Sequence, residues 1–173
     1  MTTRIGRLMA GAGMAALVAG FAGYGSTNLE AAPATASFSV TANVTANCTI
    51  AAGSLGFGSY DPVVANAASP LDQTSTLTVA CTKGTNAAVS LDLGTHASGS
   101  ARRMQSGSTA TEFLSYELYT TAARSVVWNT SNTVAYAAAS KNSSSLTVYG
   151  RVSGGQDVET GNYSDSIVAT ITF

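Results

Sequence analysis

Residues 37–45 read SFSVTANVT, and this stretch decides the fold class of the chain. Apolar and polar side chains alternate strictly along it, so that one face would carry Phe38, Val40, Ala42 and Val44. A period of two residues is typical of a β-strand that buries one face. The stretch therefore predicts a half-buried strand, and this strand ends shortly before the first cysteine of the chain.

The same alternation returns along the rest of the chain. Turn-forming residues separate the further stretches that predict strands, which are 75–82, 89–93, 113–119, 146–152 and 163–173. Residues 48–57 continue the extended character, 94–107 predict a loop with a short edge strand, and 129–145 are polar and rich in alanine. No stretch after residue 36 shows helical periodicity with caps. The chain is therefore predicted to be all-β, an antiparallel β-sandwich of one domain.

The N-terminus has the features of an export signal. Residues 1–7 carry two arginines, 8–22 are uncharged and mildly apolar, and small-residue cleavage patterns occur at 32–36. A membrane anchor is the rival interpretation, but fifteen such residues fall short of the roughly 20 that span a bilayer. We expect a signal peptide over 1–34, with cleavage between 22 and 36.

Two cysteines occur, Cys48 and Cys81. Export places them in an oxidising compartment, where an isolated pair is most simply a structural disulfide. The first cysteine stands near the start of one predicted strand and the second near the end of another. Closing this loop should stabilise the fold by about 3 to 4 kcal/mol, mainly by restricting the unfolded chain.

Composition and charge exclude several classes of partner. Charged residues make up 10% of the 173 residues, and the formal net charge is −1. Removing Arg4, Arg7 and Glu30 with the signal leaves six basic and eight acidic residues, or −2. This charge is too weak to favour nucleic acid or anionic lipid. We therefore expect no nucleic-acid partner.

The residues that could support catalysis or metal binding are few. His96 is the only histidine, so a serine or cysteine nucleophile would need it as its base, and it lies in a Gly/Ser-rich stretch. The spacing of His96 from the two cysteines matches no zinc pattern. The carboxylates, Asp165 among them, are scattered and predicted to be solvated, as is the pair Arg102 and Arg103. We expect no enzyme, no catalytic residue, no metal and no cofactor.

An ordered set of short motifs carries a family resemblance from about residue 36 to 173. Any one motif is weak alone, but the order is fairly specific: CTI at 48–50, FGSY at 57–60, LTVAC at 77–81, RM at 103–104, YELY at 116–119, VYGRV at 148–152 and GNYSD at 161–165. In this order the chain resembles the spore coat protein U family, which includes subunits of archaic chaperone-usher pili. Residues 129–145 match that pattern poorly.

The resemblance implies an incomplete immunoglobulin-like sandwich, completed by donor-strand exchange. Residues 35–47 would be the N-terminal donor strand, with Phe38, Val40, Ala42 and Val44 inserted into a neighbour, and 48–173 the pilin-like domain. The acceptor groove and chaperone contact would be bordered by Ile167, Ala169, Ile171 and Phe173. The partners implied are a periplasmic chaperone, an outer-membrane usher and other copies or related subunits.

The function implied is that of a structural subunit of a pilus or coat, serving adhesion or biofilm formation. Such a subunit would be exported through the periplasm to the cell surface. The alternative is a self-contained, lectin-like carbohydrate-binding module in which 37–44 folds into its own sheet. Exposed aromatic residues would then line the sugar site, and the candidates are Tyr116, Tyr119, Trp128 and Tyr149.

Overall fold

The computed structural model describes residues 30–173, which fall into two units divided after Thr41. The predicted signal peptide lies almost entirely outside the described residues. Residues 30–41 carry no regular secondary structure. Within the described part of the chain, no helix is long and apolar enough to cross a membrane.

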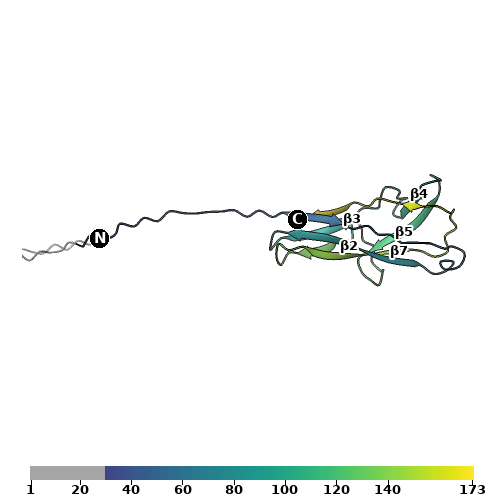
Figure 1. Ribbon diagram of the computed structural model, residues 1–173, viewed down its shortest axis with the longest axis horizontal. Helices are drawn as coiled ribbons and strands as arrows, with labels where there is room; N and C mark the ends of the chain where they lie inside the picture. The colour runs from purple at the N-terminus through teal and green to yellow at the C-terminus, as the bar shows by residue number, and fades with distance from the viewer. Residues whose placement is uncertain (1–29) are drawn as a thin grey trace, which may run out of the picture. The chain divides into compact units, whose positions relative to one another are not determined.

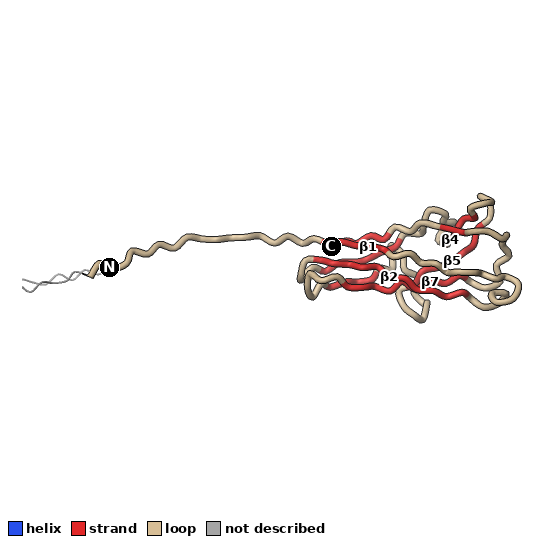
Figure 2. Tube along the Cα trace, in the orientation of Figure 1, coloured by secondary structure: helices blue, strands red, loops and turns tan. Residues whose placement is uncertain are grey.

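The second unit, Ala42–Phe173, is an antiparallel β-sandwich (Figures 1 and 2). Every pairing between its strands is antiparallel. The larger sheet has the order β1-β2-β7-β5-β4-β8, and the smaller has the order β6-β3-β9. The strands are β1 (Cys48–Ala52), β2 (Leu71–Cys81), β3 (Asn86–Leu91), β4 (Arg102–Ser106), β5 (Phe113–Tyr119), β6 (Val134–Ala137), β7 (Ser144–Val152), β8 (Tyr163–Ser164) and β9 (Ala169–Thr172). The predicted all-β sandwich is confirmed.

Several strand predictions need correction. The strand expected over 163–173 is split, because β8 pairs with β4 in one sheet and β9 with β3 in the other. The short strand expected within 94–107 is present as β4, but it is not an edge, because it lies between β5 and β8. The polar stretch 129–145 contains β6, which was missed.

No strand forms over residues 37–45 of the single chain. The side chains of Phe38, Val40 and Val44 are 86%, 81% and 80% exposed. The prediction of a half-buried strand is therefore not met within one copy. A strand needs a neighbouring edge for its backbone hydrogen bonds, and this segment has none in the described chain.

The core holds one charged residue that sequence analysis placed in solvent. Arg102 is fully buried, pairs with Glu117 and donates to the backbone oxygens of Asp92 and Trp128. Burial of an arginine is tolerable when its donors are satisfied in this way. Trp128 is also fully buried, and its indole donates to the Val89 oxygen at 2.9 Å. It therefore packs in the core and lines no surface sugar site.

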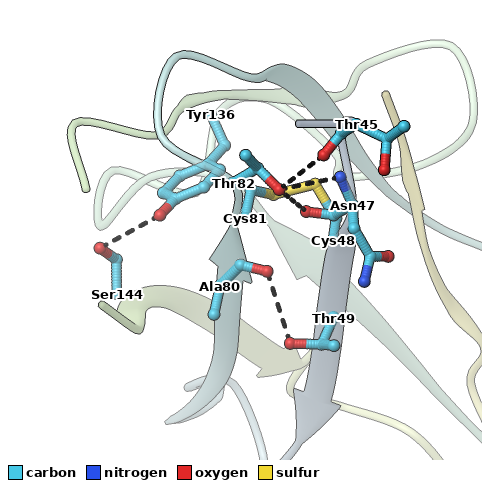
Figure 3. The surroundings of a disulfide bond; sticks show 9 residues. All are labelled: Thr45, Asn47, Cys48, Thr49, Ala80, Cys81, Thr82, Tyr136 and Ser144. Carbon is cyan, nitrogen blue, oxygen red and sulfur yellow. Dashed lines mark hydrogen bonds between the residues drawn. A yellow bond between two sulfur atoms is a disulfide. The ribbon is translucent and has the colours of Figure 1, made fainter. Parts of the chain in front are cut away.

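The predicted disulfide is confirmed and fixes one end of the sandwich (Figure 3). Cys48 begins β1, Cys81 ends β2, and the two residues lie opposite each other in the ladder. Beside them, the Thr82 hydroxyl donates to the Thr45 oxygen at 3.2 Å and accepts from the Asn47 amide at 3.1 Å. The chain therefore enters the domain at this end.

The two ends of the sandwich can be named from the strand directions. We call the end with Cys48, the β2–β3 turn and the β6–β7 turn the disulfide pole. β2 runs toward this pole and β7 runs away from it. The opposite end, where β2 begins and β4 and β7 end, is the far pole. Residues 58–70, 107–112 and 153–162 lie there.

Candidate functional site

An apolar cavity of about 340 Å³ opens between the two sheets. Residues 52–57 line one side of it and residues 163–169 the other, and we call this opening the seam. Core side chains form its floor, among them Leu77, Leu91, Leu118 and Val148. The strands that continue its two sides, β1 and β9, each pair on one edge only among the described residues. The seam thus offers both an apolar interior and free strand edges.

The first wall of the seam depends on a glycine of the opposite strand. Leu55 and Phe57 both pack over Gly150 of β7, where a Cβ would lie 2.9 Å from a carbon atom of each. Phe57 also meets the Tyr116 ring edge-on, with 6.1 Å between the ring centroids. A glycine at 150 is needed because any side chain there would push this wall outward.

The second wall is held by a buried carboxylate. The Asp165 side chain is only 2% exposed. Its Oδ1 accepts from the amides of Thr95 and His96 at 2.9 and 3.2 Å, and the His96 Nδ1 lies 3.1 Å away. Its Oδ2 accepts from the Tyr116 hydroxyl at 2.7 Å. The prediction that Asp165 is solvated is therefore wrong, because its side chain is buried and accepts from the Thr95 amide, the His96 amide and the Tyr116 hydroxyl.

This carboxylate network shapes the wall in two ways. Burial raises the pKa of Tyr116, and the hydrogen bond to Asp165 raises that pKa further, so the hydroxyl keeps its proton and donates. Gly94 has φ +84°, and a Cβ there would lie 2.0 Å from the Asp165 Oδ2. Only glycine fits this position. The His96 ring lies beside Asp165 at this wall.

The predicted acceptor residues divide into two groups. Ile167 and Ala169 line the seam. Ile171 instead pairs with Val89 and packs against the core, and Phe173 is 54% exposed at the end of the chain. Sequence reasoning missed the first wall, although the alternation of Leu55 and Phe57 with glycines at 56 and 58 was a usable signal.

The predicted donor residues lie on two units. Phe38 and Val40 belong to the first unit, and Ala42 and Val44 begin the second. All four are exposed. They keep the alternating pattern of a strand with one apolar face, and in the described chain nothing covers that face.

Fold and seam together define a class: a disulfide-linked antiparallel sandwich with an apolar opening between two unpaired strand edges. Within that class, residues 34–170 match the sequence model of the Spore Coat Protein U domain. The chain therefore belongs to the spore coat protein U domain family, as the motif order predicted. This is a family of exported structural proteins, so the prediction that the chain is not an enzyme is confirmed.

Two known proteins are similar to parts of this chain. Protein U of Myxococcus xanthus is 42% identical over 73 residues, which are 42% of this chain and 40% of that protein. A solved chain of the CsuC-CsuE chaperone-tip adhesion subunit pre-assembly complex, from archaic chaperone-usher Csu pili of Acinetobacter baumannii, matches with a TM-score of 0.49 and 19% identity. That match covers 75% of this chain and 40% of the solved chain. Each match thus spans less than half of the relative's length.

Proposed function

We propose that this protein is a structural subunit of a bacterial surface fibre or coat that polymerises by inserting residues 37–45 into the seam of the next copy. The open apolar seam between β1 and β9 is the observation that carries the proposal. A strand added there would bury its own apolar face and pair the free edges. Residues 35–47 are then the donor strand, and 48–173 the accepting domain.

The donor segment has the length that the seam requires. Phe38 to Val44 and Tyr163 to Ala169 each comprise seven residues, about 20 Å when extended. Burying each large apolar side chain of the donor contributes roughly 1.5 to 3 kcal/mol. Each new backbone hydrogen bond adds a net 0.5 to 1.5 kcal/mol, roughly. Several such contributions together support a long-lived joint between copies.

Head-to-tail repetition of this joint does not close, so it builds a fibre. An exposed donor segment and an open seam would also promote premature association, which is why we propose a periplasmic chaperone that covers the seam and an outer-membrane usher that exchanges it for the next copy. Ile167, Ala169, Ile171 and Phe173 are the proposed chaperone contact. Adhesion and biofilm formation are the proposed roles of the assembled product.

A self-complemented chain tests this function directly. Residues 37–45 are appended after Phe173 through a short Asn/Gly turn, so that the segment can fold back into its own seam. We expect a monomer on gel filtration with a higher melting temperature than the unmodified chain, which should form polymers or aggregate. The control carries Asp at the appended equivalents of Phe38 and Val40, and should gain no stability.

The lectin-like alternative predicts the opposite result. In that case the unmodified chain is a stable monomer without any chaperone, and the appended segment changes neither its size nor its melting temperature. This outcome would reject polymerisation through the seam.

A further inference from the structure

The two poles of the sandwich carry opposite charge. Lys83 and Lys141, the only lysines of the chain, are exposed in the turns of the disulfide pole, and residues 42–47, 82–85 and 138–143 there hold no Asp or Glu. Residues 58–70, 107–112 and 153–162 of the far pole contain no Lys or Arg. Their carboxylates are Asp61, Glu112, Asp157 and Glu159. The poles are therefore electrostatically complementary.

The far pole also exposes two apolar side chains on one ordered turn. Val63 and Val64 are 81% and 77% exposed on adjacent positions of one turn. The Asp61 Oδ1 accepts from both of their amides, at 3.0 and 3.1 Å, which lowers the pKa of Asp61 and keeps it ionised. The buried Asn66 closes the turn, since its amide donates to the Asp61 oxygen at 2.7 Å. The turn holds two valines in solvent at fixed positions.

The disulfide pole offers a matching surface. An open depression there is lined by the disulfide and Ala80 together with six polar residues, which are Asn47, Thr49, Thr82, Lys83, Ser140 and Lys141. Apolar atoms nevertheless form most of its exposed surface. The side chains of Val63 and Val64 could bury apolar surface in this depression. The carboxylates of the far pole would attract the lysines that line it.

The tether between donor strand and domain limits which poles can meet. β1 and β9 run in opposite directions, so a donor between them is antiparallel to one and parallel to the other. If the donor runs antiparallel to β9, its Val44 end lies by Tyr163 at the far pole. Only residues 45–47 separate Val44 from Cys48, so the donor copy's disulfide pole lies within about 14 Å of that point. A parallel donor would instead bring two disulfide poles together, with four lysines opposed.

We propose that successive copies dock pole to pole, the far pole of one against the disulfide pole of the next. Val63 and Val64 sit in the depression over the neighbour's disulfide, and Asp61, Asp157 and Glu159 face its Lys83 and Lys141. This contact rests on the proposed strand insertion and adds to it. With strand insertion alone, only the three-residue linker 45–47 sets the angle between copies. The pole contact would fix that angle.

Zero-length carbodiimide crosslinking of assembled polymers tests the contact. β2 alone has 11 residues and spans about 35 Å, so Lys83 or Lys141 cannot reach a far-pole carboxylate within one copy. We expect crosslinked peptides joining either lysine to Asp61, Asp157 or Glu159. In Lys83→Glu with Lys141→Glu these crosslinks are lost. Crosslinking is not informative for that variant alone, so the angular spread between copies is also measured by electron microscopy, and it should widen.

Charge exchange provides the control. Adding Asp157→Lys and Glu159→Lys to the lysine variant should restore the crosslinks and the narrow angular spread. Polymers that form normally but crosslink only through the Phe173 carboxylate, or whose angular spread ignores both sets of substitutions, would overturn the pole contact while leaving strand insertion intact. Failure of strand insertion would look different, because the unmodified chain would then form no polymer. That result would reject both strand insertion and the pole contact.

Discussion

Replacing both Phe38 and Val40 by Asp is expected to abolish polymer formation while the sandwich stays folded. Both side chains are more than four-fifths exposed in the single chain, so the domain loses no packing. In the seam the same positions would forgo roughly 3 to 6 kcal/mol of burial together. Each carboxylate would in addition be buried without a partner, which is costly.

A loss of that size corresponds to at least about a hundredfold weaker joint, at 1.4 kcal/mol for each factor of ten. Detergent-resistant ladders on electrophoresis and the polymer peak on gel filtration measure it. Ser39→Asp with Thr41→Asp is the matched control, because it places the same charges on the opposite face of the strand. Equal ladders from the two double variants would exclude Phe38 and Val40 from the joint.

Ala169→Phe is expected to give a subunit that donates its strand but cannot accept one. Ala169 lines the seam, so a phenyl ring there occupies space that the donor needs. Overpacking of this kind costs roughly 1 to 3 kcal/mol even in a core that can adjust. Val168→Phe is the control, since Val168 is 60% exposed and lies outside the seam lining.

Mixing the two variants shows whether each keeps the half of the joint that was left unchanged. Ala169→Phe retains its donor segment, and the Phe38→Asp, Val40→Asp variant retains its seam. Each alone should stay monomeric, whereas the mixture should form a heterodimer and stop there. The heterodimer requires a folded acceptor domain in the Phe38→Asp, Val40→Asp variant, and circular dichroism beside Val168→Phe checks the fold of the Ala169→Phe domain. Ladders of Ala169→Phe as long as those of Val168→Phe would place the acceptor site elsewhere.

The alternation of apolar and polar residues predicted the strands that bury one face. It failed where pairing with distant strands determines the structure. β5 was predicted with the bounds it has, because its buried residues alternate without interruption with residues that are only partly buried or exposed. The segment 163–172 keeps one face inward throughout, so its pattern could not reveal that β8 and β9 join different sheets. β6 was missed because its four residues, two of them alanine, carry too weak a pattern.

The candidate site was predictable only in part, for the same reason. Ile167 and Ala169 follow from the period of the last segment. The first wall depends on Gly150, and the second on Asp165 with partners some 50 to 70 residues away in the chain. No local pattern shows such contacts. Arg102 was misplaced likewise, since its partners come from three separate parts of the sequence.

Amide hydrogen exchange of residues 38–45 reports directly on strand insertion between copies. We expect slow exchange in the assembled polymer, because strand insertion pairs these amides with a neighbour, and fast exchange in the Ala169→Phe monomer, which can neither receive nor deliver this segment when it is alone. Fast exchange in the polymer would contradict strand insertion between copies. Slow exchange in the lone monomer would contradict it equally, since the segment would then belong to its own sheet.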